Sequence, residues 1–216
     1  MNIIARPYGS DMCYCRPDTT WERENKDLYS PECVNGWDWA PIVFVRISKA
    51  GKCVNEKFAS RYYDGFNFGA LLYICNEEAH FASCADHTSI LPFPLYNPIV
   101  MENAENTFTA FKGETAIFEK DCTDIKRVIE DTICKASQLT SLRIGDFVAV
   151  ELAPISRLTD RNESEASPRM ELHGETTTPQ RTARPPANAL RPPGGFPTSF
   201  GPLEWNCTVR HANTMP

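Results

Sequence analysis

The stretch Ile42 to Asp64, IVFVRISKAGKCVNEKFASRYYD, decides the fold of this chain. It opens with β-branched and aromatic residues from Ile42 to Ile47, a composition typical of a buried strand. The turn Lys49-Ala50-Gly51-Lys52 follows, and a charged segment then ends in Arg61-Tyr62-Tyr63-Asp64. The stretch therefore predicts a strand, a tight turn and a polar segment in that order.

Local patterns elsewhere predict further elements. Phe111-Lys112-Gly113-Glu114 indicates a two-residue hairpin turn, because glycine accepts the positive φ that such turns need. Thr123 and Asp124 are expected to cap the amino end of an amphipathic helix over 123–138 that packs across twisted sheets. Its apolar residues at helical spacing are Ile125, Val128, Ile129 and Ile133.

Five motifs resemble those of the fumarylacetoacetate hydrolase (FAH) family. That family has K-P-D-T/S, V-R-I-x-x-x-G-K, R-Y-Y-D, A-K-A-F-D-G-S/T and S-Q-x-x-x-L-x-x-G-D. This chain has RPDT at 16–19, VRISKAGK at 45–52, RYYD at 61–64, ASCADHT at 82–88 and SQLTSLRIGD at 137–146. The resemblance covers most of residues 1–158. It implies a mostly β fold with some α-helix, a mixed β-roll that forms a single domain over 1–158.

The residues that bind metal in that family are missing. A Glu-x-Glu pair six and four residues before the arginine binds a divalent cation there, and those positions hold Ala40 and Ile42 here. Alignment on Gly69 places Leu71 at the third ligand, an aspartate in the family. Magnesium and manganese need oxygen ligands, which these side chains do not supply. We therefore predict no catalytic, cofactor-binding or metal-binding residues in this site.

Other active-site features of the family are absent too. Ser83 replaces the lysine that helps to hold substrate, and no histidine precedes His80. In the family a T-G-T-P loop binds the substrate carboxylate, and this chain has Val150-Glu151-Leu152-Ala153 at that place. Loss of one preorganised electrophilic group typically costs ~10²- to 10³-fold in rate. We expect the vacated cup to be filled by an apolar cluster of Trp37, Trp39, Pro41 and Ile42.

One group of residues suggests a different site. His80, Cys84 and His87 share a face if residues 76–86 are helical, and Cys75 or Glu77 then completes a tetrahedral zinc site. The spacing matches no established zinc motif. The alternative interpretation is two partly exposed histidines and a buried thiol. A cysteine nucleophile with a histidine base lacks a third orienting group.

Composition narrows the class of protein. The formal charge of −6 gives no basic field for nucleic acid, and no apolar run is long enough for a membrane helix. Without a signal-peptide pattern at the amino end, we expect a cytoplasmic protein. Nine cysteines at irregular spacing then indicate reduced, buried thiols, and Cys13 and Cys15 a small apolar pair. Sequons at Asn162 and Asn206 are taken as chance matches.

The composition changes after about Asp160. Residues 159–216 form a tail rich in proline, arginine, threonine and glycine, which we expect to be disordered or loosely docked. Two hypotheses remain open for it. Residues Trp205 to Val209 replace the last strand of the family's sheet, or the tail has no selected fold.

Three functions of different classes follow. The leading one is a non-catalytic FAH-fold paralogue that binds an unidentified small molecule or acts as a structural subunit, as a homodimer or with an active paralogue. The second is a hydrolase or isomerase acting on 2-oxo acids or acylpyruvates through a rearranged site. That site would use Asp64, Asp86, Glu151 or the group of His80, Cys84 and His87. The third is an interaction protein that acts through its tail.

Overall fold

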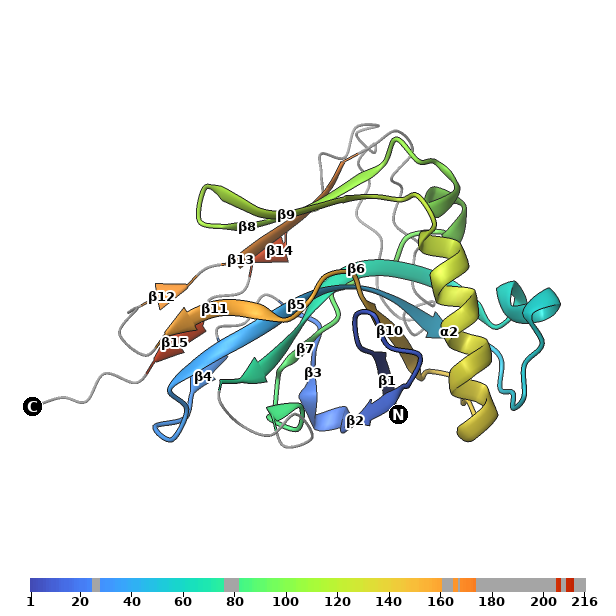
Figure 1. Cartoon of the computed structure of the whole chain (residues 1–216), viewed down its shortest axis with the longest axis horizontal. Helices are drawn as coiled ribbons and strands as arrows, with labels where there is room; N and C mark the ends of the chain where they lie inside the picture. The colour runs from blue at the N-terminus through green and yellow to red at the C-terminus, as the bar shows by residue number, and fades with distance from the viewer. Residues whose placement is uncertain are drawn as a thin grey trace, which may run out of the picture.

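A computed structural model of the chain describes residues 1–24, 28–75 and 82–160, and the backbone of four short strands at 165–166, 168–173, 205–206 and 209–211. Its largest element is an eight-stranded mixed sheet (Figure 1). The strand order is β2-β1-β10-β5-β6-β7-β3, and β11 pairs with the free part of β5. The strands are β1 (Ile3–Arg6), β2 (Tyr14–Arg16), β3 (Trp21–Glu22), β5 (Gly36–Ile47), β6 (Tyr63–Ile74), β7 (Ser89–Ile90), β10 (Phe147–Glu151) and β11 (Ser156–Asp160).

The long antiparallel ladder of β5 and β6 is the backbone of this sheet. The strand expected at 42–47 is its second half, and β5 begins six residues earlier, at Gly36. Arg46 and Asp64, from the two ends of the fold-deciding stretch, form a bidentate ion pair with N–O distances of 3.2 and 2.8 Å. At Gly69, an added Cβ would lie 2.2 Å from the carbonyl oxygen of Ile90, so glycine is required there. The ion pair thus joins the start of β6 to β5, and Gly69 lets β7 approach β6 closely.

The two faces of the ladder belong to two separate cores, because side chains alternate along a strand. Even-numbered residues of β5 face an inner core on the concave side, and odd-numbered ones face an outer core. The single apolar cluster expected from the sequence is therefore wrong, because its members belong to different cores. Trp37 and Trp39 pack in the outer core, whereas Ile42 packs in the inner core with Ala40. Because side chains alternate along a strand, Trp37 and Trp39 lie on the opposite face of β5 from Ile42.

The outer core lies under a helix and a hairpin. Helix α2 (Ile125–Leu139) buries Ile129 and Ile133, and strands β8 (Thr107–Lys112) and β9 (Thr115–Asp121) form the hairpin. Phe68 of β6 stacks on Phe108 of β8 with ring centroids 4.3 Å apart. Figure 1 shows the hairpin on one side of the long ladder and the short strands β1, β2, β3 and β7 on the other.

Local sequence signals succeeded at the hairpin and in part at the helix. Gly113 adopts φ of +60° in the two-residue turn, which confirms the hairpin. The helix is confirmed with a start at Ile125, but Asp124 makes no side-chain capping bond. Its backbone is left-handed, with φ of +62°. The described residues also form three short 3-10 helices: η1 (Asp18–Thr20), η2 (Glu56–Arg61) and η3 (Pro98–Glu102).

Strands beyond residue 160 pair with this body. Strand β13 (Pro168–His173) pairs with β8, and β14 (Trp205–Asn206) pairs with β13. Strand β15 (Val209–His211) lies between β4 (Leu28–Ser30) and β12 (Glu165–Ala166). Strand β11 runs across residue 158, where the domain boundary was expected. Most of the expected tail lies outside the described residues.

The described residues thus form one mostly β domain of the mixed β-roll type, as expected. In this part of the chain, no helix is both long and apolar enough to cross a membrane.

Candidate binding site on the inner face

Three hydrocarbon side chains form the floor of the inner face. Ala40 and Ile42 project from β5, and Leu71 projects from β6 directly opposite Ala40. All three have 0% exposure and belong to one core cluster. The structure therefore brings together the three positions at which the sequence resemblance placed the metal ligands.

Aromatic rings pack beside this floor. Phe147 of β10 lies 5.8 Å from Phe44 and 5.3 Å from Trp21, measured between ring centroids. Phe93 adds a further edge contact to Phe147 at 6.2 Å. Phe44 and Phe147 are almost completely buried. The inner face is thus filled by interlocking apolar groups.

Two carboxylates lie near the floor, and both already have partners. Glu151 stands opposite Ile42 on β10 and accepts hydrogen bonds from the Tyr73 hydroxyl and the Tyr8 backbone N–H. Asp38 precedes Ala40 by two residues on the same side of β5. It accepts from Arg157 Nε at 2.8 Å and from Cys75 Sγ at 3.3 Å. This donor set does not fit a hard divalent cation, which needs several oxygen ligands at one point.

The other end of the inner face is polar. The Tyr14 and Tyr73 hydroxyl oxygens are 2.6 Å apart, and Tyr73 donates to Glu151. Burial raises the pKa of Tyr73 well above its usual range and also raises that of Tyr14. Burial raises the pKa of Glu151 as well, against the opposing effects of its hydrogen bonds and of the Arg16 charge. Burial therefore makes Glu151 a weaker acid than an exposed glutamate, and its polar neighbours partly offset this effect.

Arg16 completes this polar end. It is only 1% exposed, and its Nη2 donates to the Leu72 carbonyl oxygen at 2.9 Å and to Thr88 Oγ1 at 2.8 Å. Its guanidinium carbon lies 5.0 Å from the centre of the Tyr73 ring. Its Nε and Nη1 atoms have no hydrogen-bond partner among the described residues. Arg16 thus links β2 to β6, on the other side of the curled sheet.

Strand alternation explains how the polar end is assembled. Tyr14 and Arg16 are two residues apart on β2, whose residues pair with Ala5 and Ile3 of β1. They therefore face the inner core, as Tyr73 of β6 and Glu151 of β10 do. The sequence patterns pointed to Glu151 but did not place Tyr14, Arg16 and Tyr73 beside it. The polar residues at alternate positions 14 and 16 were the only available signal.

The alternative site expected around residues 80–87 is only partly covered by the structure. Glu77 and His80 lie outside the described residues. The helix that such a zinc site requires does not extend to residue 86, because residues 86–87 form a turn and His87 has φ of +59°. The alternative interpretation is confirmed for His87, which is exposed, and wrong for Cys84, which is exposed and not buried. His87 Nδ1 instead lies 3.1 Å from Glu22 Oε2. The described residues contain no group of three or more His, Cys, Asp or Glu side chains suited to a metal.

The other carboxylates named from the sequence have different surroundings from Glu151. Asp64 pairs with Arg46, and Asp86 is exposed. The expectation of buried thiols holds for only two of the eight described cysteines, Cys75 and Cys122, and Cys13 and Cys134 are half-buried. Cys15, Cys33, Cys53 and Cys84 are exposed, although all eight are free thiols.

Comparison with known proteins supports the fold. No family model matches the sequence, and neither does any curated protein. Among solved structures, the chain is similar to maleylpyruvate hydrolase from Sphingobium sp. SYK-6, with a TM-score of 0.69, 12% identity and coverage of 98% of this chain and 70% of that one. The same hydrolase has also been solved in complex with manganese(II) ion and pyruvate (TM-score 0.66, 12% identity, coverage 98% and 71%).

Two further structures have the same fold. One is 2-hydroxyhepta-2,4-diene-1,7-dioate isomerase from Mycobacterium marinum, with a TM-score of 0.68, 11% identity and coverage of 97% and 73%. The other is a protein from Yersinia pestis CO92 assigned to the fumarylacetoacetate hydrolase family, with a TM-score of 0.65, 14% identity and coverage of 81% and 88%. The chain therefore has the FAH fold.

Proposed function

We propose that this chain is a non-catalytic protein with the FAH fold, which acts as a binding or structural subunit. One observation carries the proposal. The inner-face positions Ala40, Ile42 and Leu71 offer only hydrocarbon where the family resemblance places three carboxylates. Solved neighbours of this fold are hydrolases and isomerases, and one of them was solved with manganese(II) and pyruvate. A Lewis acid of that kind has no oxygen ligands at these three positions.

Purified full-length protein tests the proposal with two assays. Acylpyruvates and oxaloacetate, supplied with Mg²⁺ or Mn²⁺, should give no turnover above that of buffer. The same ions should leave the melting temperature unchanged, because a ligand stabilises a protein only when it binds the folded state preferentially. Turnover together with a metal-dependent rise in melting temperature would overturn the proposal.

A second candidate function rests on the polar end of the inner face. Glu151, whose pKa is raised by burial, lies beside the Tyr73 hydroxyl and near the positive charge of Arg16. A carboxyl group with a raised pKa is a typical general acid. This favours a hydrolase or isomerase that acts on 2-oxo acids or acylpyruvates through a rearranged site.

The Glu151→Gln variant separates the two candidates. If wild-type protein turns over an acylpyruvate and the variant, purified in parallel, does not, then the rearranged site is the correct reading. If neither protein shows turnover, the non-catalytic reading stands. The parallel purification also controls for a contaminating enzyme.

The remaining expectations belong to the same proposal. As a subunit, the chain would form a homodimer or pair with an active relative in the cytoplasm, and light scattering of the purified protein measures the first. A function in the tail would appear as loss of partner binding when the chain is truncated after Asp160.

A further inference from the structure

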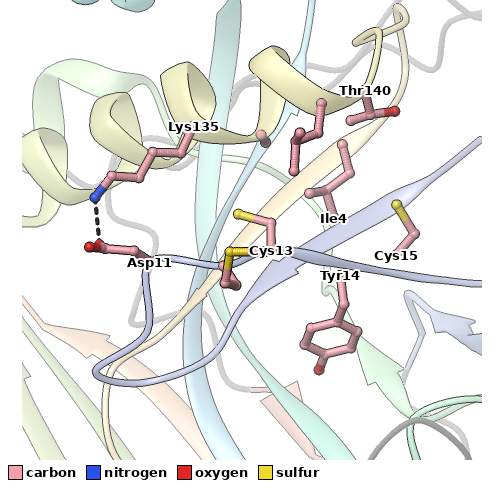
Figure 2. Close-up of a pocket in the computed structure, with 10 residues that line it drawn as sticks. Ile4, Asp11, Cys13, Tyr14, Cys15, Lys135 and Thr140 are labelled. Carbon is pink, nitrogen blue, oxygen red and sulfur yellow. Dashed lines mark hydrogen bonds and ion pairs between the residues drawn. The ribbon is translucent and has the colours of Figure 1, made fainter.

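A small hollow lies between β2 and the carboxyl-terminal half of α2 (Figure 2). Its volume is about 150 Å³, and Ile4 and Ala136 lie among its apolar lining residues. Lys135 lies at one side, where its Nζ contacts Asp11 at 2.6 Å. The hollow is on the outer side of the sheet, opposite the face that carries Tyr14 and Arg16. It is therefore separate from the inner-face cluster.

Three sulfur-containing side chains line this hollow: Met12, Cys13 and Cys15. Figure 2 shows Cys13 and Cys15 on the side of the strand that faces α2, with Tyr14 directed to the opposite side. Met12 is 66% exposed, Cys15 is exposed and Cys13 is half-buried. The Met12 and Cys15 side chains are thus accessible to solvent, and Cys13 is partly so.

The strand geometry favours a bridging metal over a disulfide. Cys15 lies in β2 and Cys13 directly precedes it, and residues two apart in extended chain are separated by about 6.6 Å, since each residue rises by about 3.3 Å. A disulfide needs Cβ atoms roughly 3.5–4.5 Å apart, which an extended strand does not provide. Two metal–sulfur bonds of about 2.3 Å each allow the sulfur atoms to lie up to about 4.6 Å apart. A bridging ion therefore requires the Cys13 and Cys15 side chains to rotate toward one another.

We propose that Cys13 and Cys15, assisted by Met12, form a binding site for a soft monovalent cation, Cu(I). Thiolate and thioether sulfur are the ligands that select Cu(I) over hard cations. Zinc prefers four ligands in a tetrahedron, and the described lining of the hollow supplies only two thiols and one thioether. Asp11 is already paired with Lys135 and Arg6.

Binding releases two protons. As each sulfur–copper bond forms, the Cys13 or Cys15 thiol loses its proton to the buffer, and the bis-thiolate complex carries a net charge of −1. Burial raises the pKa of both thiols, so the affinity should increase with pH. The positive charges of Arg6 and Lys135 partly oppose this shift at Cys13.

Alkylation of the full-length reduced protein tests the site without any variant. Cu(I) is added anaerobically to one equivalent, exposed thiols are labelled with iodoacetamide, and the labelled peptides are identified by mass spectrometry. We expect loss of labelling at Cys13 and Cys15 together, while Cys33 and Cys53 stay reactive. Protection of other cysteines with Cys13 and Cys15 still reactive would overturn the proposal, as would no protection at all.

A competition titration with the Cu(I) chelator bicinchoninate gives a second readout. The Cys13→Ser/Cys15→Ser variant should lose the stoichiometric binding of the wild type. The matched control, Cys33→Ser/Cys53→Ser, removes two exposed thiols elsewhere and should keep it. Equal affinity in the wild type and the Cys13→Ser/Cys15→Ser variant would contradict the assignment. If that variant does not fold, the wild-type labelling pattern decides.

Discussion

The inner face of the curled sheet has two ends with opposite chemistry. At the floor, Ala40, Ile42 and Leu71 are fully buried and contribute only hydrocarbon. At the polar end, Arg16, Tyr14, Tyr73 and Glu151 form a buried hydrogen-bonded cluster. The two ends adjoin, because Leu71 and Tyr73 are two residues apart on β6 and Glu151 of β10 stands opposite Ile42 of β5.

The two ends contribute differently to the free energy of folding. The floor is stabilised by removal of apolar surface from water, at ~25 cal/mol per Å². The polar end contains buried groups that need partners, and two guanidinium nitrogens of Arg16, Nε and Nη1, have none among the described residues. Each buried polar group left without a partner typically costs about 1–3 kcal/mol. The floor therefore contributes stability. The polar end has buried groups that a ligand could satisfy, which makes it the better candidate for binding or chemistry.

Placing a charge in the floor should give the largest effect. Ile42→Glu removes about 1.5–3 kcal/mol of apolar burial. It also adds an unpaired buried charge opposite Glu151, at about 3–5 kcal/mol. We expect a loss of roughly 5 kcal/mol or more in the free energy of unfolding at pH 7, measured by urea denaturation. Ile117→Glu on β9, where Ile117 is 38% exposed, is the control and should change little.

Emptying the aromatic wall of the floor should have the next largest effect. Phe147→Ala removes a ring that packs against Trp21, Phe44 and Phe93, and should cost about 3–5 kcal/mol. The matched variant Phe58→Ala affects a ring that is 42% exposed and should cost far less. Thermal unfolding of both variants measures the difference. Equal losses would mean that the floor is not a packed core.

A single hydroxyl group tests the polar end. Tyr73→Phe removes the group that bonds both Tyr14 and Glu151, and should cost about 1–3 kcal/mol because those partners stay buried. Tyr8→Phe is the control, since the Tyr8 ring is half exposed and only its backbone N–H contacts Glu151. A stabilised Tyr73→Phe variant would show that the cluster is strained.

The smallest effect is a change in pH dependence. The pKa of Glu151 is raised above its ordinary value of 4.5, so the folded state favours the protonated form. The stability due to that form is complete below pH 4.5 and is lost as the pH rises through the raised value. Glu151→Gln should therefore be no less stable than the wild type near pH 7, and its relative stability should fall as the pH is lowered. Urea denaturation at several pH values measures this, and the opposite trend would place the carboxylate in an ion pair.

Sequence patterns predicted the elements that depend on local signals. The strand at 42–47, the turn at Gly113 and the helix behind Asp124 were all found from neighbouring residues. Arg46 and Asp64 of the quoted stretch proved to hold the central ladder through their ion pair. The family motifs supplied the topology that these local patterns do not give.

The errors arose where the answer depends on which face a residue occupies or on distant partners. Trp37 and Trp39 were grouped with Ile42, although the alternation along β5 places both tryptophans in the outer core and Ile42 in the inner core. The Tyr73–Glu151 hydrogen bond joins residues 78 positions apart, and no local pattern indicates it. Asp124 has the residue type of a helix cap but adopts a left-handed backbone without a capping bond.

A manganese titration followed by electron paramagnetic resonance tests the central claim most directly. Free hydrated Mn²⁺ gives a six-line spectrum that disappears when the ion is bound to protein. We predict that the full-length protein leaves this signal unchanged at one equivalent, because the floor supplies no oxygen ligands. Stoichiometric loss of the signal, abolished by Glu151→Gln, would show that a metal is held at the inner face and would contradict the account.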